Sequence, residues 1–350
     1  MEKRESPLED SAEMKSMKNI WEGKTVFITG ANGFLGTQLT KRALSNKSKV
    51  IVLIKENIPD SLFHRGKLNH KVKVFKGSLV NQQLIHSIFK TNKVDLCLHV
   101  GAQAIVNIAN KSPVDTFKSN IEGTWNILEA SRLFGVGALI VASSDKAYGD
   151  QKKLPYTEDS PLLALHPYDA SKACADILSR TYARTYHLPV AVTRCANIYG
   201  PGDVNLSRVI PDTLQSVFHD KNPVIRSDGT PLRDYVFVED IVTAYFLLAE
   251  KIYLKKIKYG QAFNFGTGKP ISVLNLVKEI IRVSGKMHLR PVILGKSRLK
   301  GEIQKQTLFS RKAEALLGWE PEYALEEGLR KTYQWNSNAM PNTGLGPAGK

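Results

Sequence analysis

The sequence predicts an α/β protein: a Rossmann-like, doubly wound parallel sheet with a smaller, interleaved C-terminal substrate-binding region. Short β-branched runs alternate with helical patterns over residues 25–193, which is typical of a parallel sheet with crossover helices. A glycine-rich turn follows the first of these runs, and 350 residues are enough for a large core. The predicted strands span 25–29, 50–54, 72–75, 96–100, 138–142 and 189–193.

The alternation breaks after residue 193, which defines the predicted domains. Turn residues at 197–202 precede a helical pattern from about 209 to 219, and another helix opens near residues 236–240. We therefore expect a flexible N-terminal arm and a disordered C-terminal tail around two regions. The predicted divisions are 1–20 for the arm, 21–193 with 236–265 for the NAD(P)-binding Rossmann domain, 194–235 with 266–336 for the substrate-binding region, and 337–350 for the tail.

Composition restricts the class of protein. Apolar residues make up 42% of the chain without any run of eighteen, so we expect no membrane span, and the polar N-terminus does not resemble a signal peptide. Cys97, Cys174 and Cys195 form neither a disulfide framework nor a metal-binding pattern, which favours a cytoplasmic location and no metal.

The net charge of +16 indicates first a solvated basic surface, and second anionic ligands that carry a diphosphate. Basic residues are scattered and no ribonucleoprotein pattern accompanies them, so we expect no nucleic-acid partner.

The glycine turn at residues 30–36 predicts a dinucleotide site. Gly30 permits the tight turn, Gly33 lets the backbone approach a pyrophosphate, and Gly36 lets the helix pack on the strand. The helix N-terminus supplies free amides to the phosphates, so Asn32, Phe34 and Leu35 are predicted to contact the cofactor as well. The alternative is a glycine-rich packing turn.

The choice between NAD and NADP stays open. Lys55, after the second strand, could meet a 2′-phosphate, whereas Glu56 could accept the free 2′-hydroxyl. Ser78 and Leu79, after the third strand, are predicted to face the adenine.

Two short segments carry the predicted chemistry: Ser144, Asp145 and Lys146 after the fifth strand, and Tyr168 with Lys172 on a helix. Tyr168 and Lys172 are four residues apart and share one helix face. We expect the lysine ammonium to lower the pKa of the phenol, which then takes the proton of a sugar hydroxyl as its hydride passes to nicotinamide. Ser144 would hydrogen-bond the same oxygen. The alternative is a solvent-facing helix pair.

These motifs, with others, occur in the order seen in extended short-chain dehydrogenases/reductases, which the chain resembles from about residue 21 to 335. Within that superfamily it resembles nucleotide-sugar 4,6-dehydratases, and CDP-glucose 4,6-dehydratases in particular. The segments that carry the resemblance are 21–36, 99–103, 120–124, 144–146, 168–172, 197, 233–240 and 317–321.

The resemblance implies an NAD(P)-dependent lyase that converts a nucleotide-diphosphate hexose to its 4-keto-6-deoxy form. C4 oxidation acidifies the C5 hydrogen, water leaves across C5 and C6, and hydride returns to C6. Asp145 would be the acid that helps water leave and Lys146 the C5 base, where many members have glutamate. These roles require a protonated Asp145 and a neutral Lys146; the alternative is a surface ion pair.

The resemblance also implies ligand contacts and assembly. Asn120 would hold a helix kink and a relay water beside the cofactor, or would simply cap a helix, and Ala102 with Gln103 would line the cofactor site. The predicted substrate-binding residues are Gln103, Asn107, Ser144, Asn197, Arg208 and Arg233. We expect a homodimer or homotetramer. Its subunits would pair through helices, and the helix that carries Tyr168 is the candidate face.

Several positions depart from the family pattern. Ser78 and Phe309 stand where aspartate is common, Gly101 replaces an alanine, and residues 198–202 are closer to epimerases. A nucleotide-sugar epimerase or decarboxylase of the same fold is therefore the main alternative function. A non-catalytic NAD(P)-binding sensor or scaffold is the third hypothesis.

Overall fold

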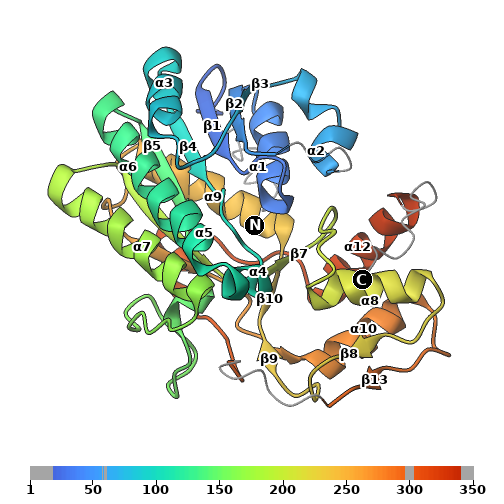
Figure 1. Cartoon of the computed structure of the whole chain (residues 1–350). Helices are drawn as coiled ribbons and strands as arrows, with labels where there is room; N and C mark the ends of the chain where they lie inside the picture. The colour runs from blue at the N-terminus through green and yellow to red at the C-terminus, as the bar shows by residue number, and fades with distance from the viewer. Residues whose placement is uncertain (1–18, 57, 59–60, 296–302, 340–350) are drawn as a thin grey trace, which may run out of the picture.

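The computed structural model describes residues 19–56, 58, 61–295 and 303–339, and its centre is a seven-stranded parallel sheet (Figure 1). The strand order is β11-β6-β5-β4-β1-β2-β3, so the order reverses between β1 and β4, as in doubly wound folds. The strands are β1 Thr25–Thr29, β2 Lys49–Ile54, β3 Lys73–Lys76, β4 Leu96–His99, β5 Ala138–Ala142, β6 Val190–Cys195 and β11 Ala262–Phe265.

Helices cover both faces of this sheet, and the strands alternate their side chains between the two cores. In β5, Ile140 packs with one core and Leu139 with the other. One core is covered by α1 Phe34–Ser45, α9 Val238–Tyr253 and α11 Arg311–Leu317. The other is covered by α3 Gln82–Asn92, α6 Gly123–Phe134 and α7 Pro167–Tyr186. Burial on both faces explains why the strand sequences are almost continuously apolar.

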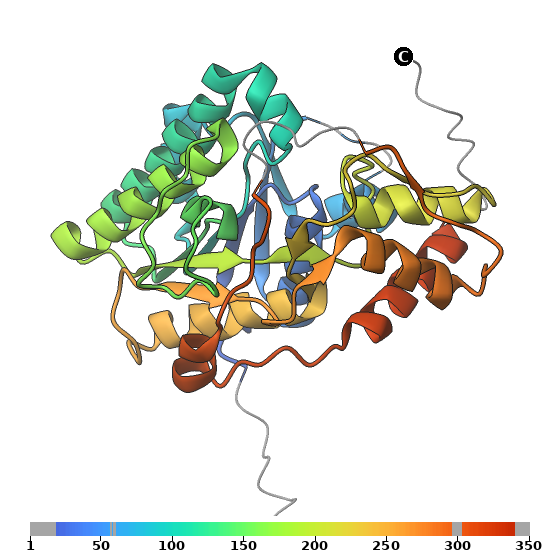
Figure 2. The same cartoon turned by 90° about the horizontal axis from the view of Figure 1, so that it is seen from below.

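A third core lies beside the sheet and is built mainly by helices that follow β6, visible at the right of Figure 2. These helices are α8 Val209–Phe218, α10 Val273–Ser284 and α12 Leu325–Ala339. Ser272 caps α10, because its Oγ accepts the Asn275 amide at 3.2 Å. No helix in the described ranges is both long and apolar enough to cross a membrane.

Short elements connect these layers. Three two-stranded pairs join β7 Asn197–Tyr199 to β10 Tyr235–Phe237, β9 Leu232–Arg233 to β12 Ile271–Ser272, and β8 Val224–Ile225 to β13 Val292–Ile293. The remaining short helices are α2 Leu62–Arg65, η1 Leu68–His70, α4 Val106–Lys111, α5 Pro113–Phe117, the π-helical turn η2 Lys118–Glu122 and η3 Asp145–Tyr148.

The predicted fold class is confirmed, with small differences in the elements. All six predicted strands form, within two residues at each end, and β11 adds a seventh at the edge beside β6. The helix α12 continues to residue 339 and so includes the first three residues of the tail predicted from 337; residues 1–18 and 340–350 lie outside the described ranges. The domain divisions stay a prediction.

Two adjacent leucines in α11 test how this helix is held against the sheet. Leu317 is 4% exposed in the core, whereas Leu316 is 43% exposed. We expect Leu317→Ala to lower the free energy of unfolding by about 2–5 kcal/mol, because it leaves a cavity. Leu316→Ala should change it by less than about 0.5 kcal/mol. Urea unfolding of both variants measures the difference, and equal losses would contradict the packing of α11.

Candidate active site

A cavity of about 900 Å³ lies at the carboxyl ends of β1, β4, β5 and β6. Such ends at the point where strand order reverses are where open α/β sheets bind ligands. Every residue that the sequence nominated for catalysis, cofactor or substrate lines this cavity, with the exception of Asn120. The structure thus brings together side chains that are up to about two hundred residues apart in the chain.

The glycine turn forms the floor of one end of the cavity and fits a dinucleotide. Gly30 has φ +66°, and a Cβ there would lie 2.7 Å from the Cα of Gly101. A Cβ at Gly36 would collide with the Gly30 carbonyl. The first turn of α1 therefore presents its free amides to the cavity, with Phe34 and Leu35 lining it and no acidic side chain to compete.

The end of the cavity where the cofactor ribose is expected holds both residues that could contact its 2′ position, Lys55 and Glu56. Lys55 Nζ lies 3.2 Å from Glu56 Oε1 in an exposed ion pair, and Asn32 Nδ2 donates to the Glu56 carbonyl at 2.8 Å. Ser78 and Leu79 line the adjacent wall. Because the cation and the carboxylate share this edge, the geometry suits a free 2′-hydroxyl or a 2′-phosphate, and NAD versus NADP stays open.

Asn120 is not among the residues that line the cavity, and its predicted contact with the cofactor stays a prediction. It sits in η2, so it is not a helix cap. Its Oδ1 accepts the Gln103 amide at 2.7 Å, and its Nδ2 donates to the Gln103 carbonyl and to Ser171 Oγ. Asn120 is 2% exposed because these bonds enclose it, and it holds the Gln103 loop from behind. The Gln103 and Ala102 residues themselves line the cavity.

Tyr168, Lys172 and Ser144 meet at the centre of the cavity. Ser144 hydrogen-bonds the Tyr168 hydroxyl. Lys172 Nζ does not reach the phenol but donates to the Ala142 carbonyl at 2.8 Å. Burial raises the pKa of Tyr168 to about 12, more than the Ser144 bond and Arg208 lower it. The expectation that Lys172 lowers this pKa is therefore wrong for the protein without ligand, since desolvation is the larger effect.

Asp145 and Lys146 face the same cavity, so they are not a surface pair. Asp145 is 1% exposed, and its Oδ1 lies 3.4 Å from Lys146 Nζ and accepts from Ser144 Oγ at 3.1 Å. Its Oδ2 has no hydrogen-bond partner among the described residues. Lys146 Nζ also donates to Asn197 Oδ1 at 3.1 Å. The pair is thus an ion pair beside an open acceptor, which leaves Oδ2 available to a ligand hydroxyl or a proton.

The nominated substrate residues are spread along the other end of the cavity. Arg208 Nη1 donates to Asp203 Oδ2 at 2.9 Å, and Arg233 Nη1 donates to the Leu232 carbonyl at 3.0 Å. Both arginines line the cavity and supply positive charge for an anionic ligand. Asn107 lines the cavity from α4. The side-chain oxygen of Asn197 already accepts a hydrogen bond from Lys146 Nζ.

Sequence reasoning missed several lining residues. Asp203 forms an ion pair with Arg208 and orients it. The five-residue spacing of this acid and this arginine in a turn could have predicted the ion pair. Tyr235, Tyr245 and Cys195 line the cavity too, but nothing in their spacing distinguishes them from core residues. His99 is buried and hydrogen-bonded between the Thr29 and Thr124 hydroxyls, which is typical of a structural histidine.

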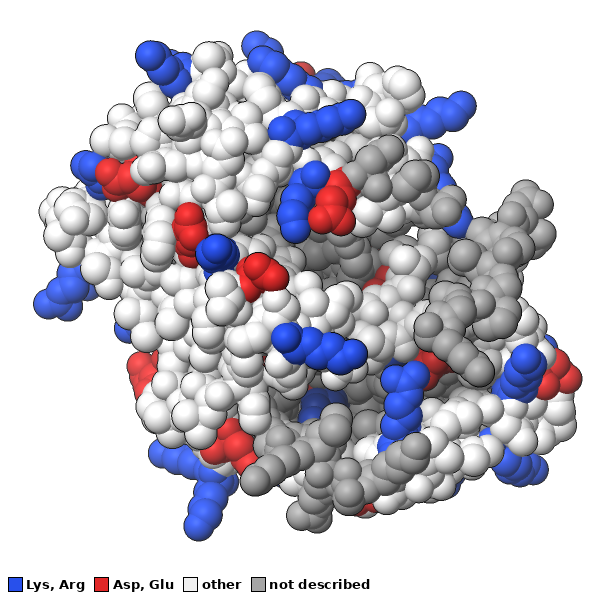
Figure 3. Space-filling model, in the orientation of Figure 1, with Lys and Arg blue, Asp and Glu red and all other residues white. Residues whose placement is uncertain are grey.

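The surroundings of the cavity are mixed in charge. Figure 3 shows Lys and Arg side chains scattered over this face, with acidic residues between them. Within the described ranges, no group of three or more His, Cys, Asp or Glu residues could hold a metal ion.

Lys172 gives the site a measurable pH dependence. Burial lowers the pKa of its ammonium from 10.5 to about 8. Between these values the unfolded state binds more protons than the folded state, so the contribution of this residue to stability rises with pH. We expect the free energy of unfolding of Lys172→Met to exceed that of the wild type by roughly 3 kcal/mol near pH 7, with the difference disappearing between pH 8 and 10.5. Urea unfolding across this range measures it; a pH-independent difference, or the same trend in the exposed Lys153→Met control, would contradict the assignment.

Known proteins match this architecture over most of the chain. The model of the NAD-dependent epimerase/dehydratase family matches residues 26–266. A UDP-glucuronate 4-epimerase of Thermodesulfobacterium geofontis is 31% identical over 322 residues, which cover 88% of this chain and 95% of that protein.

Solved structures give the same result. A UDP-glucose 4-epimerase of Thermotoga maritima with UDP-glucose superposes with TM-score 0.82 at 30% identity, covering 90% and 99% of the two chains. A dTDP-glucose 4,6-dehydratase of Bacillus anthracis in complex with NAD does so with TM-score 0.79 at 26% identity, covering 90% and 97%. The chain therefore belongs to the NAD-dependent epimerase/dehydratase family, with NAD(P) as its cofactor.

Proposed function

We propose that this protein is a nucleotide-sugar 4,6-dehydratase, which converts a nucleotide-diphosphate hexose to the 4-keto-6-deoxy sugar. The observation that carries the proposal is the Asp145–Lys146 pair, which lines the same cavity as Tyr168 and Ser144. An acid and an amine beside an alcohol-oxidising site are what elimination of water after oxidation requires. Both epimerases and 4,6-dehydratases occur among the relatives, so the residues of the site have to decide between them.

Oxidation at C4 would use the central group of the site. When bound, the nicotinamide ring takes a hydride from the sugar and later returns one. Ser144 and Tyr168 hold the 4-hydroxyl oxygen between them, and Tyr168 accepts its proton. Because burial raises the pKa of this phenol to about 12, Tyr168 acts as a base only when a positive charge joins it in the cavity. Lys172 moving from the Ala142 carbonyl toward a ligand hydroxyl would supply part of that charge.

Elimination needs a protonated Asp145 and a neutral Lys146, and one proton transfer produces both. Lys146 Nζ lies 3.4 Å from Asp145 Oδ1, so its proton can pass to the carboxylate without exchange with solvent. Displacement of water by a sugar would lower the cost of this transfer, since an ion pair loses its solvation in a closed site. Lys146 then removes the C5 proton, and Asp145 protonates the departing C6 hydroxyl. The two cavity arginines, Arg208 and Arg233, would bind the diphosphate of the substrate.

A nucleotide-sugar 4-epimerase is the second candidate, favoured by the identity to the UDP-glucuronate 4-epimerase. Such an enzyme would use Ser144, Tyr168 and Lys172 in the same way but would need no acid at position 145. In that case the Asp145–Lys146 ion pair would serve only to hold Asn197 and the cavity wall.

Product analysis distinguishes the two candidates. We expect incubation with UDP-, dTDP- or CDP-glucose to give a product lighter by one water that develops a 4-keto chromophore in alkali. A product of unchanged mass with inverted C4 would instead establish the epimerase. Lys146→Met should lower solvent deuterium uptake at C5 by about 100-fold or more while C4 oxidation continues, because only the C5 base is lost. Uptake at the wild-type rate would exclude that role, and the exposed Lys153→Met serves as the control.

A further inference from the structure

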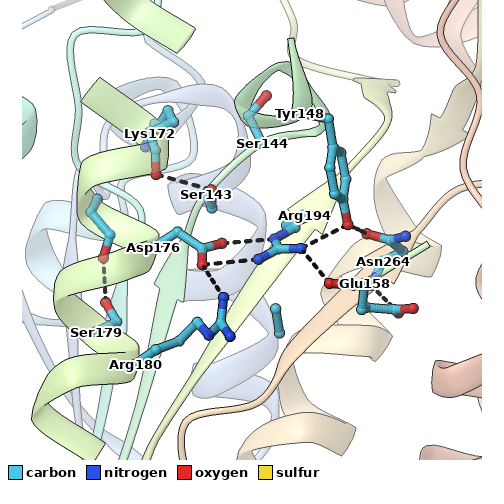
Figure 4. Close-up of polar contacts among 12 residues, drawn as sticks. Ser143, Ser144, Tyr148, Glu158, Lys172, Asp176, Ser179, Arg180, Arg194 and Asn264 are labelled. Carbon is cyan, nitrogen blue, oxygen red and sulfur yellow. Dashed lines mark hydrogen bonds and ion pairs between the residues drawn. The ribbon is translucent and has the colours of Figure 1, made fainter. Parts of the chain in front are cut away.

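Beneath the cavity, Arg194 of β6 is completely buried at 0% exposure, and it does not line the cavity. Its Nε and Nη2 donate to the two carboxylate oxygens of Asp176 at 2.7 and 3.0 Å (Figure 4). Its Nη1 donates to the Tyr148 hydroxyl at 2.8 Å and to the Glu158 carbonyl at 3.1 Å. The proposed chemistry gives this guanidinium no direct role.

The two side chains that Arg194 joins belong to the two segments that carry the proposed catalytic groups. Asp176 lies on α7, four residues after Lys172 and on the same helix face. Tyr148 ends η3, two residues after Lys146. The guanidinium therefore bridges the helix of the redox pair to the turn of the acid–amine pair.

The far side of Tyr148 is fixed as well. Its hydroxyl donates to Asn264 Oδ1 of β11 at 2.7 Å, and the Asn264 amide donates to Glu158 Oε1 at 2.8 Å. The ring stacks on Tyr156 with centroids 4.8 Å apart. Because these links are directional and are buried or partly buried, η3 has little freedom to move relative to α7.

Stability alone does not call for such an arrangement. A buried ion pair contributes little to stability compared with apolar residues of the same volume. A bidentate guanidinium, however, fixes both the distance and the orientation of its partners. A displacement of about 1 Å between reacting groups can cost about 100-fold in rate.

We propose that Arg194 is a positioning residue that sets the distance between Tyr168–Lys172 and Asp145–Lys146. The inference rests on the proposed function for its kinetic consequence, since only a dehydratase needs both pairs aligned on one sugar. The geometric consequence, a fixed placement of η3 against α7, does not depend on which reaction the enzyme performs.

Tyr148→Phe tests the proposal with little disturbance of the core, because it keeps the ring and the Arg194–Asp176 pair but removes the hydroxyl that ties Arg194 to η3. The matched control is Tyr156→Phe. Tyr156 is also buried and stacked, and its hydroxyl donates to the Gly149 carbonyl at 2.7 Å rather than to Arg194. Tyr156→Phe thus loses one buried hydrogen bond, whereas Tyr148→Phe loses two, from Arg194 Nη1 and to Asn264 Oδ1.

Single-turnover kinetics would follow C4 oxidation by cofactor absorbance and elimination by loss of water. We expect Tyr148→Phe to slow elimination relative to oxidation by at least 10-fold, with KM and the dissociation constant of NAD(P) unchanged. Tyr156→Phe should keep the wild-type ratio of the two rates. An equal loss in both steps, or the same ratio in both variants, would overturn the proposal.

Crystal structures of both variants without substrate provide the readout that is independent of turnover. We expect η3 to shift against α7 in Tyr148→Phe only, with loss of the Lys146–Asn197 bond; an unmoved η3 overturns the positioning role. If the wild type epimerises, the proposed function fails on its product, while the crystal structures still decide the role of Arg194. Arg194→Lys, which keeps the charge but cannot bind Asp176 in a bidentate manner, should give the same shift.

Discussion

The shared parallel register of β4, β5 and β6 is the constraint on which the site depends. His99 pairs with Val141, and Ala142 pairs with Thr193, so the three strands end together at one edge of the sheet. The strands are buried on both faces and carry almost no polar side chains until they end. Polar groups therefore appear just beyond the strand ends, where Ser144 and Gln103 meet in one cavity. A shift of register by one residue would exchange the two cores and separate these groups.

Desolvation at this edge sets the protonation of the central groups. Burial raises the pKa of Tyr168 to about 12 and lowers that of Lys172 to about 8, so it favours the neutral form of both. At neutral pH the phenol is therefore protonated, while most of the Lys172 side chain still carries its proton, so Tyr168 is a poor base until positive charge moves beside it. The site is consequently most reactive when it is filled, which limits side reactions of the protein without substrate.

The sequence predicted those parts of the molecule that local pattern specifies. Alternating apolar runs identified six strands, and the glycine turn located the dinucleotide end of the cavity. The seventh strand, β11, has four residues and no distinctive flanking pattern, so only its pairing with β6 reveals it. The direction of the Tyr168 pKa shift was predicted wrongly, because the spacing to Lys172 says nothing of where the ammonium points.

Long-range contacts explain the remaining gaps. Asn120 was nominated for its resemblance to a family position, yet its bonds to Gln103 and Ser171 place it behind the wall. Asp176 and Arg194 are 18 residues apart, and Tyr148 and Asn264 are 116 apart. No spacing rule links such pairs, because sheet topology rather than helix periodicity brings them together.

The difference between a dehydratase and an epimerase reduces to the state of one proton in the Asp145–Lys146 pair. As an ion pair, Asp145 and Lys146 only order the cavity wall. With the proton on Asp145, the pair would be a carboxylic acid beside a neutral amine base. That neutral state is useful only if the pair lies beside C5 and C6 of the sugar while Tyr168 holds C4. Fixed spacing between η3 and α7 would meet that condition, and Arg194 bridges these two elements. On the proposed function, the buried network and the acid–amine pair are therefore parts of one arrangement for elimination.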